Sequence, residues 1–167
     1  ELAVIAGLPP VASYSDAVHR IQERVSGLQI LTLDFAARQL RAGTAPVSMA
    51  PAELAFAAML MRRIIDRRGS LECPGEGPDP QLAADYLREY RRLEPTSTHR
   101  TERALAPGMD RAFFLQRRAR YNAALRAALG PLAQPYCVQT TGRRPATRYA
   151  LPLSVDRIRL IGEAQTS

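Results

Sequence analysis

The stretch that decides the fold is residues 51–65, Pro-Ala-Glu-Leu-Ala-Phe-Ala-Ala-Met-Leu-Met-Arg-Arg-Ile-Ile. Pro51 suits the first turn of a helix, and Glu53 complements the positive end of the helix dipole. From Leu54 onward, apolar residues occupy nearly every face of such a helix until two arginines interrupt them. Because a helix that is apolar all round must be enclosed, the stretch predicts a buried central helix.

Short β segments are expected in front of the central helix. The residues from Leu28 to Leu33 are mostly apolar and predict a strand. Ala42-Gly43-Thr44 marks a turn, and Val47-Ser48-Met49 predicts a short return strand. Together these segments predict a small N-terminal β-hairpin at the front of the domain.

Two further helices follow the central one. Asp79 and Pro80 open the second, whose apolar residues recur at three- and four-residue steps. Residues 95–108 are polar and broken by proline and glycine, so we expect them to be exposed. The third helix spans residues 110–129 and stops at a Gly-Pro pair. At about 100° per residue, its apolar face holds Phe114, Tyr121, Leu125 and Ala128, and its opposite face holds Arg117, Arg120, Ala124 and Ala127.

The C-terminal part predicts a second β-hairpin. A strand, a turn at Gly142-Arg-Arg-Pro145 and a partner strand follow one another over residues 136–151. Arg143, Arg144 and Arg148 crowd the tip and shoulder of this hairpin. In those positions their side chains can contact the phosphates of a nucleic acid.

The order of the elements is a small front sheet, a buried helix, two more helices and a terminal hairpin. A helix-turn-helix unit followed by a hairpin is the winged-helix arrangement, in which the third helix can enter a major groove. We therefore expect an α+β, mainly helical fold, with a winged helix-turn-helix over residues 28–160 and a tail over residues 161–167. Residues 1–27 predict a linker and a short helix that arrive from an upstream domain.

The composition is that of a globular domain, with 46% hydrophobic and 23% charged residues in a chain of 167. No apolar run approaches the roughly 18–20 residues that a membrane span needs, so no membrane partner is expected. Cys73 and Cys137 are too few for a disulfide scaffold, which favours a reduced, cytoplasmic compartment.

The charge is concentrated in the second part of the chain, and all 23 basic residues are arginines. Residues 1–61 hold four arginines and five acidic residues, whereas residues 62–167 hold nineteen arginines and eleven acidic residues. Such an asymmetry favours a nucleic acid, DNA or RNA, as the partner. The candidate contact residues are Arg117, Arg120, Arg126, Arg143, Arg144 and Arg148.

Several stretches resemble the winged-helix domain of OmpR/PhoB-type response regulators. The run from Leu31-Thr-Leu-Asp34 to Pro51-Ala-Glu-Leu54 is similar to the strand, hairpin and helix start of that family. Asn122-Ala-Ala-Leu-Arg126 and Arg148-Tyr-Ala-Leu151 are similar to its final helix and hairpin. The resemblance covers residues 28–153 and implies the winged-helix fold.

The chain also resembles CRISPR-associated proteins that carry an N-terminal CARF domain, a Rossmann-like sensor of cyclic oligoadenylate. The points of likeness are Ser13-Tyr14-Ser15, Pro51-Ala-Glu-Leu-Ala-Phe56, Phe113-Phe114, Asn122-x-x-Leu125-x-x-x-Leu129-Gly130 and Thr147-Arg148-Tyr149. This resemblance implies a type III CRISPR system, a homodimer, and a sensor that binds cyclic oligoadenylate upstream of these residues. It also implies that this chain is the output domain, which the arginine-rich second part predicts to bind nucleic acid without a cofactor of its own. Any ring-nuclease or ribonuclease activity would belong to the upstream domain or to an Arg-x6-His site in this chain.

Arg92 and His99 are the candidate catalytic residues of an alternative function. Six residues separate them, a spacing similar to that of HEPN ribonucleases, in which the Arg stabilises the phosphate and the His helps to activate the ribose hydroxyl. Pro95 interrupts the helix that would present such a pair, so the sequence favours a binding protein over an enzyme.

A second alternative is a degenerate winged helix that serves dimerisation or partner docking. No metal site is expected, because the cysteines and histidines are single and widely spaced.

Overall fold

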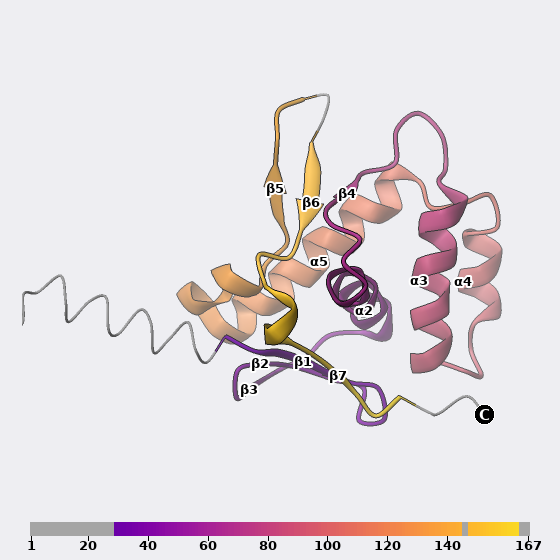
Figure 1. Ribbon diagram of the computed structural model, residues 1–167. Helices are drawn as coiled ribbons and strands as arrows, with labels where there is room; N and C mark the ends of the chain where they lie inside the picture. The colour runs from indigo at the N-terminus through magenta and orange to yellow at the C-terminus, as the bar shows by residue number, and fades with distance from the viewer. Residues whose placement is uncertain (1–28, 145–146, 164–167) are drawn as a thin grey trace, which may run out of the picture.

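The computed structural model describes residues 29–144 and 147–163. Within these ranges the chain forms four α-helices and two small β-sheets, which confirms the predicted α+β class (Figure 1). The linker and helix expected over residues 1–27 lie outside the described residues.

The front sheet has four strands, whereas the sequence predicted a hairpin of two. Its strands are β1 (Leu31–Asp34), β2 (Gln39–Ala42), β3 (Ala45–Val47) and β7 (Ile158–Ile161), in the order β3-β2-β1-β7. β1 pairs antiparallel with β2 and parallel with β7, so the two ends of the domain meet in one sheet. β7 thereby extends one residue into the segment that was expected to be a tail.

α2 (Pro51–Ile65) is the enclosed central helix that its composition predicted. Every side chain from Glu53 to Met61 is buried, and Phe56 has no exposed surface. The helix contacts α3, α5 and β7, and Figure 1 shows it nearly end-on in the middle of the molecule. The later elements are therefore arranged around α2.

Side-chain caps set the starts of the two long helices that follow α2. Asp79 accepts a hydrogen bond of 2.9 Å from a backbone N–H in the first turn of α3 (Pro80–Leu93). Asp110 accepts one of 2.7 Å in the first turn of α5 (Arg111–Leu129). Both helices are confirmed where the sequence predicted them.

A short helix lies in the segment 95–108 that was expected to be an exposed loop. α4 (His99–Ala104) is followed by Leu105, which is buried in the core. Its six residues are too few for hydrophobic periodicity to reveal a helix. Gly108, with φ +115°, then passes so close to α3 that a Cβ would lie 2.8 Å from the carbonyl carbon of Asp79.

The second sheet carries the C-terminal hairpin, which projects from the body of the molecule (Figure 1). Its antiparallel strands are β4 (Leu71–Glu72), β6 (Arg148–Ala150) and β5 (Gln139–Thr141), in the order β4-β6-β5. The hairpin is confirmed, but β5 begins later than predicted because a 3₁₀ helix, η1 (Gly130–Tyr136), follows α5 directly. A second one, η2 (Val155–Arg157), leads into β7.

Candidate nucleic-acid interface

α5 is fixed to the core along one side. Phe114, Tyr121 and Leu125, which the sequence placed on its apolar face, have no exposed surface. The ring of Phe114 packs edge-on against Phe56 of α2, with centroids 5.5 Å apart. It packs in the same way against Tyr149 of β6 at 5.2 Å. These contacts hold α5 between the central helix and the hairpin.

Arg117 does not lie on the exposed face of α5, and that prediction was wrong. Its side chain is buried, and its Nη1 donates to Glu53 of α2 at 2.5 Å. Its guanidinium also covers the ring of Phe113, 5.1 Å from the centroid. Residues four apart on a helix are separated by about 40°, so Arg117 must share the side of Tyr121. Because it is already paired with a buried carboxylate, Arg117 is not available to a phosphate.

The exposed side of α5 carries two of the predicted contact residues. Arg120 and Arg126 are both exposed, and neither forms an ion pair with another described residue. The neighbouring exposed side chains are uncharged and mostly small: Ala112, Gln116, Ala119, Ala123, Ala127 and Ala128. Alanines beside arginines let a partner approach the helix backbone while the guanidinium groups reach outward.

The hairpin carries the other three predicted contact residues. Arg143 and Arg144 follow β5 and are exposed, and they form no ion pair within the described ranges. Arg148 is also exposed, but its Nη2 donates to Glu72 of β4 at 2.7 Å. Two of the three therefore present their full charge to solvent, and the third helps to hold β6 to β4.

Besides the packing of Phe114 on Tyr149, two further contacts attach the hairpin to α5, and sequence reasoning missed both. The side-chain amide of Asn122 accepts a hydrogen bond from the backbone N–H of Val138 (2.8 Å) and donates one to its carbonyl (3.2 Å). The guanidinium of Arg118 lies over the ring of Tyr149, 5.0 Å from the centroid. The arginines of α5 and of the hairpin are thus held in a fixed relation to one another.

The chain from Arg111 to Val155 contains eight arginines and no acidic residue over 45 residues. α3 provides the contrast, because its arginines Arg88, Arg91 and Arg92 all form ion pairs with carboxylates. The charge of α3 is therefore compensated within the protein. The charge of α5 and the hairpin is compensated only at Arg117 and Arg148 among the described residues.

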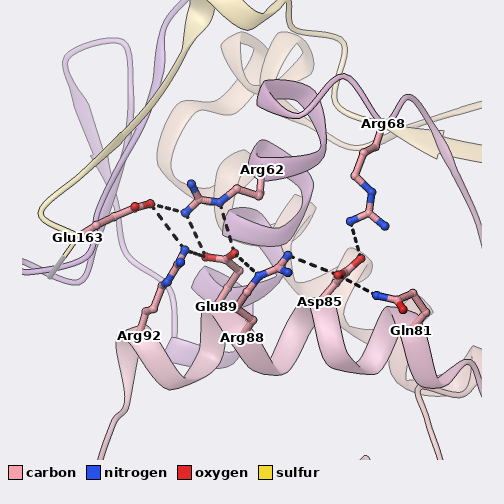
Figure 2. A network of polar contacts seen from close by, with 8 residues as sticks. All are labelled: Arg62, Arg68, Gln81, Asp85, Arg88, Glu89, Arg92 and Glu163. Carbon is pink, nitrogen blue, oxygen red and sulfur yellow. Dashed lines mark hydrogen bonds and ion pairs between the residues drawn. The ribbon is translucent and has the colours of Figure 1, made fainter. Parts of the chain in front are cut away.

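The arginines around α3 neutralise a buried carboxylate (Figure 2). Glu89 has no exposed surface, and it is approached by Arg62 of α2 at 3.4 Å, Arg88 at 3.4 Å and Arg92 at 3.1 Å. Arg62 and Arg92 also contact Glu163, just after β7. A buried charge is tolerated only when it is paired, so these arginines hold α2, α3 and the C-terminal segment together.

The candidate catalytic pair lies in two separate environments. Arg92 belongs to the cluster around Glu89, where its Nη1 donates to that carboxylate. His99 has a side chain that is 94% exposed, and its only described ion-pair neighbour is Glu102 at 3.9 Å. No hydrogen bond joins Arg92 to His99, and each has a different carboxylate partner, Glu89 for Arg92 and Glu102 for His99.

The other candidate chemistries find little support in the described parts of the chain. Cys73 and Cys137 are free thiols, and burial raises the pKa of both, which keeps them protonated near neutral pH. Nowhere in residues 29–144 and 147–163 do three or more His, Cys, Asp or Glu side chains gather as a metal site requires.

None of the described helices is long and apolar enough to cross a membrane. In comparisons with known proteins, the chain matches no protein-family model, no curated protein and no solved structure.

Proposed function

We propose that the region from α2 to β6 is a winged helix-turn-helix that binds duplex DNA through α5 and the β5–β6 hairpin. The order of elements supports this fold, since α2, α3 and α5 supply three helices and the hairpin follows the third as a wing does. β4, which lies between α2 and α3, pairs with β6 and so holds the hairpin against the helices. In this scheme α4 is an insertion between the second and third helices.

The observation that carries the proposal is the acid-free run from Arg111 to Val155. Its exposed and uncompensated arginines include Arg120, Arg126, Arg143 and Arg144. They lie on the two elements that a winged helix uses, and Arg presents the planar set of donors that matches a phosphate. A positive surface of this kind attracts a polyanion and supplies most of its non-specific affinity.

The shape of α5 favours DNA over RNA. The major groove of B-form DNA admits an α-helix, whereas the major groove of A-form RNA is too deep and narrow for side chains to reach the bases. The alanines on the exposed side of α5 keep the helix slim enough for close approach. A duplex of DNA is therefore the partner that this helix fits.

The wider setting of the proposal comes from the sequence alone. The resemblance implies that this domain is the output region of a CRISPR-associated CARF protein that responds to cyclic oligoadenylate and forms a homodimer, and the low cysteine count favours a cytoplasmic location. The ribonuclease alternative with Arg92 and His99 would need Arg92 to leave the carboxylate of Glu89, with which it pairs in this chain.

Partner docking remains the second candidate, because one observation favours it. An apolar hollow of about 840 Å³ lies where the front sheet meets η1, between Ile30 and Tyr136. Leu132 also lines this hollow and is 68% exposed. If docking were the only function, the arginines of the hairpin would not affect DNA binding.

The hairpin provides the first test of DNA binding. Replacing Arg143 and Arg144 together by alanine should weaken the affinity for duplex DNA, because two phosphate contacts are lost. The slope of log K against log salt should fall by about one unit for each lost contact. Fluorescence anisotropy at several salt concentrations measures both quantities.

A matched control is available on α4. Arg100 and Arg103 are exposed and form no ion pair with other described residues, so their joint replacement by alanine removes the same charge. That control should bind duplex DNA nearly as the wild type does. Equal affinity for all three proteins at low salt would exclude the hairpin from the binding surface.

A further inference from the structure

Gln116 occupies the exposed side of α5 and contacts a buried ion pair beneath it. Its Oε1 accepts a hydrogen bond of 2.9 Å from Nη2 of Arg117. Nη1 of the same guanidinium donates to Glu53, a carboxylate that is itself buried. Glu53, Arg117 and Gln116 thus form a chain of polar contacts that runs from the core to the surface of α5.

This chain fixes which end of the Gln116 amide faces outward. An arginine side chain has donors and no acceptor, so only the oxygen of the amide can face Arg117. The guanidinium is held in turn by Glu53 and by the ring of Phe113. A flip of the amide would set its NH₂ group against the guanidinium and leave Nη2 of Arg117 without its partner, beside Nε, which is buried and already has none. Nε2, with two hydrogens, is therefore the free end.

A donor at this position distinguishes the bases of a major groove. Guanine presents two acceptors there, O6 and N7, whereas adenine presents one acceptor and one donor. A freely rotating glutamine matches adenine with its oxygen and nitrogen together. A glutamine whose oxygen is occupied has only hydrogens to offer, and the two acceptors of guanine suit it better.

We propose that Gln116 recognises a guanine in the major groove, and that Glu53 and Arg117 are positioning residues that set this preference. The inference rests on the proposed binding of duplex DNA through α5. Gln116 lies in the N-terminal half of that helix, the part of a recognition helix that reaches base edges. Arg120 and Arg126 lie on either side of it around the exposed side of the helix, and they would contact the phosphates of the DNA backbone.

The test begins by selecting bound sequences from a library of randomised DNA duplexes with the full chain. Binding of the selected site is then compared with sites in which each G·C pair is changed to A·T. At one position the wild type should prefer G·C by about tenfold. Gln116→Ala should lose the preference at that position and keep the base preferences of the wild type at every other position. Gln39→Ala, on β2 of the front sheet, is the matched control and should behave as wild type.

A second variant tests the positioning role. Replacing Glu53 by Gln and Arg117 by Met removes the buried charges together and frees the Gln116 amide to rotate. In that protein the preference at the same position should broaden from guanine to guanine and adenine. A merely structural role would leave base preference unchanged. Should the double variant fail to fold, the comparison of wild type with Gln116→Ala still decides the inference.

The outcomes separate the inference from the proposed function. In one outcome the double variant Arg120→Ala with Arg126→Ala loses duplex binding, but no base preference of the wild type depends on Gln116. That result overturns the inference and leaves DNA binding in place. A preference for adenine at the Gln116 position overturns it as well. Absence of any duplex binding overturns both.

Discussion

Replacing Phe56 by alanine is expected to lower the free energy of unfolding by about 3–5 kcal/mol. The side chain has no exposed surface, and its ring packs edge-on against Phe114 and Tyr121 with centroids 5.5 and 6.3 Å away. The substitution removes this apolar surface from the point where α2 and α5 meet. Against a total stability of about 5–15 kcal/mol, the loss is large and should be plain in urea unfolding followed by circular dichroism.

The control for this prediction is Leu132→Ala. Leu132 is 68% exposed, so its truncation should change the free energy of unfolding by no more than about 0.5 kcal/mol. If Phe56→Ala were as stable as the wild type, α2 would not be the enclosed centre of the domain. The position of α5, and of the arginines on it, would then have no basis.

Arg117→Ala is expected to be as damaging, at about 3–5 kcal/mol. It removes the guanidinium that faces Glu53 and leaves a buried carboxylate without its partner. The double replacement Glu53→Gln with Arg117→Met removes both charges and should recover most of the loss. Thermal unfolding of the single and double variants measures this difference.

The control is Arg120→Ala, three residues further along the same helix. Arg120 is exposed, so its removal should change stability by no more than about 0.5 kcal/mol. An Arg117 on the exposed side of α5, where the sequence prediction placed it, would give equally small effects in both variants. That result would contradict the buried ion pair and the positioning of Gln116.

The three long helices could be predicted because their signals are local. Asp79 and Asp110 are capping residues just before a helix, and Gly130, with φ +55°, follows the end of α5. The front sheet was only half predicted: β2, which lies between the two predicted strands, was missed, and β7 pairs with β1 across almost the whole chain. No pattern among neighbouring residues reveals such a pairing.

The candidate surface could be predicted only in part for a similar reason. The positions of Arg143 and Arg144 on an exposed hairpin follow from a turn sequence that the residues themselves display. The side of α5 that Arg117 occupies follows from its spacing of four residues from Tyr121. The carboxylate that pairs with it could not be predicted, because Glu53 lies 64 residues earlier in the chain. The sequence predicts no role for Gln116, a glutamine among arginines and alanines, because its role depends on that same distant contact.

The measurement that tests the account most directly is the salt dependence of duplex DNA binding by two matched quadruple variants. One replaces the uncompensated arginines of α5 and the hairpin by alanine: Arg120, Arg126, Arg143 and Arg144. The other replaces four exposed arginines elsewhere that form no ion pair among the described residues: Arg41, Arg67, Arg100 and Arg103. Both lose the same charge, so net charge alone cannot separate them.

The proposed function predicts that the first variant loses about four units from the slope of log K against log salt, one for each phosphate contact. The second should keep the slope of the wild type, with only a small loss of affinity from its reduced long-range attraction. Equal slopes for the two variants would contradict a DNA-binding surface on α5 and the hairpin.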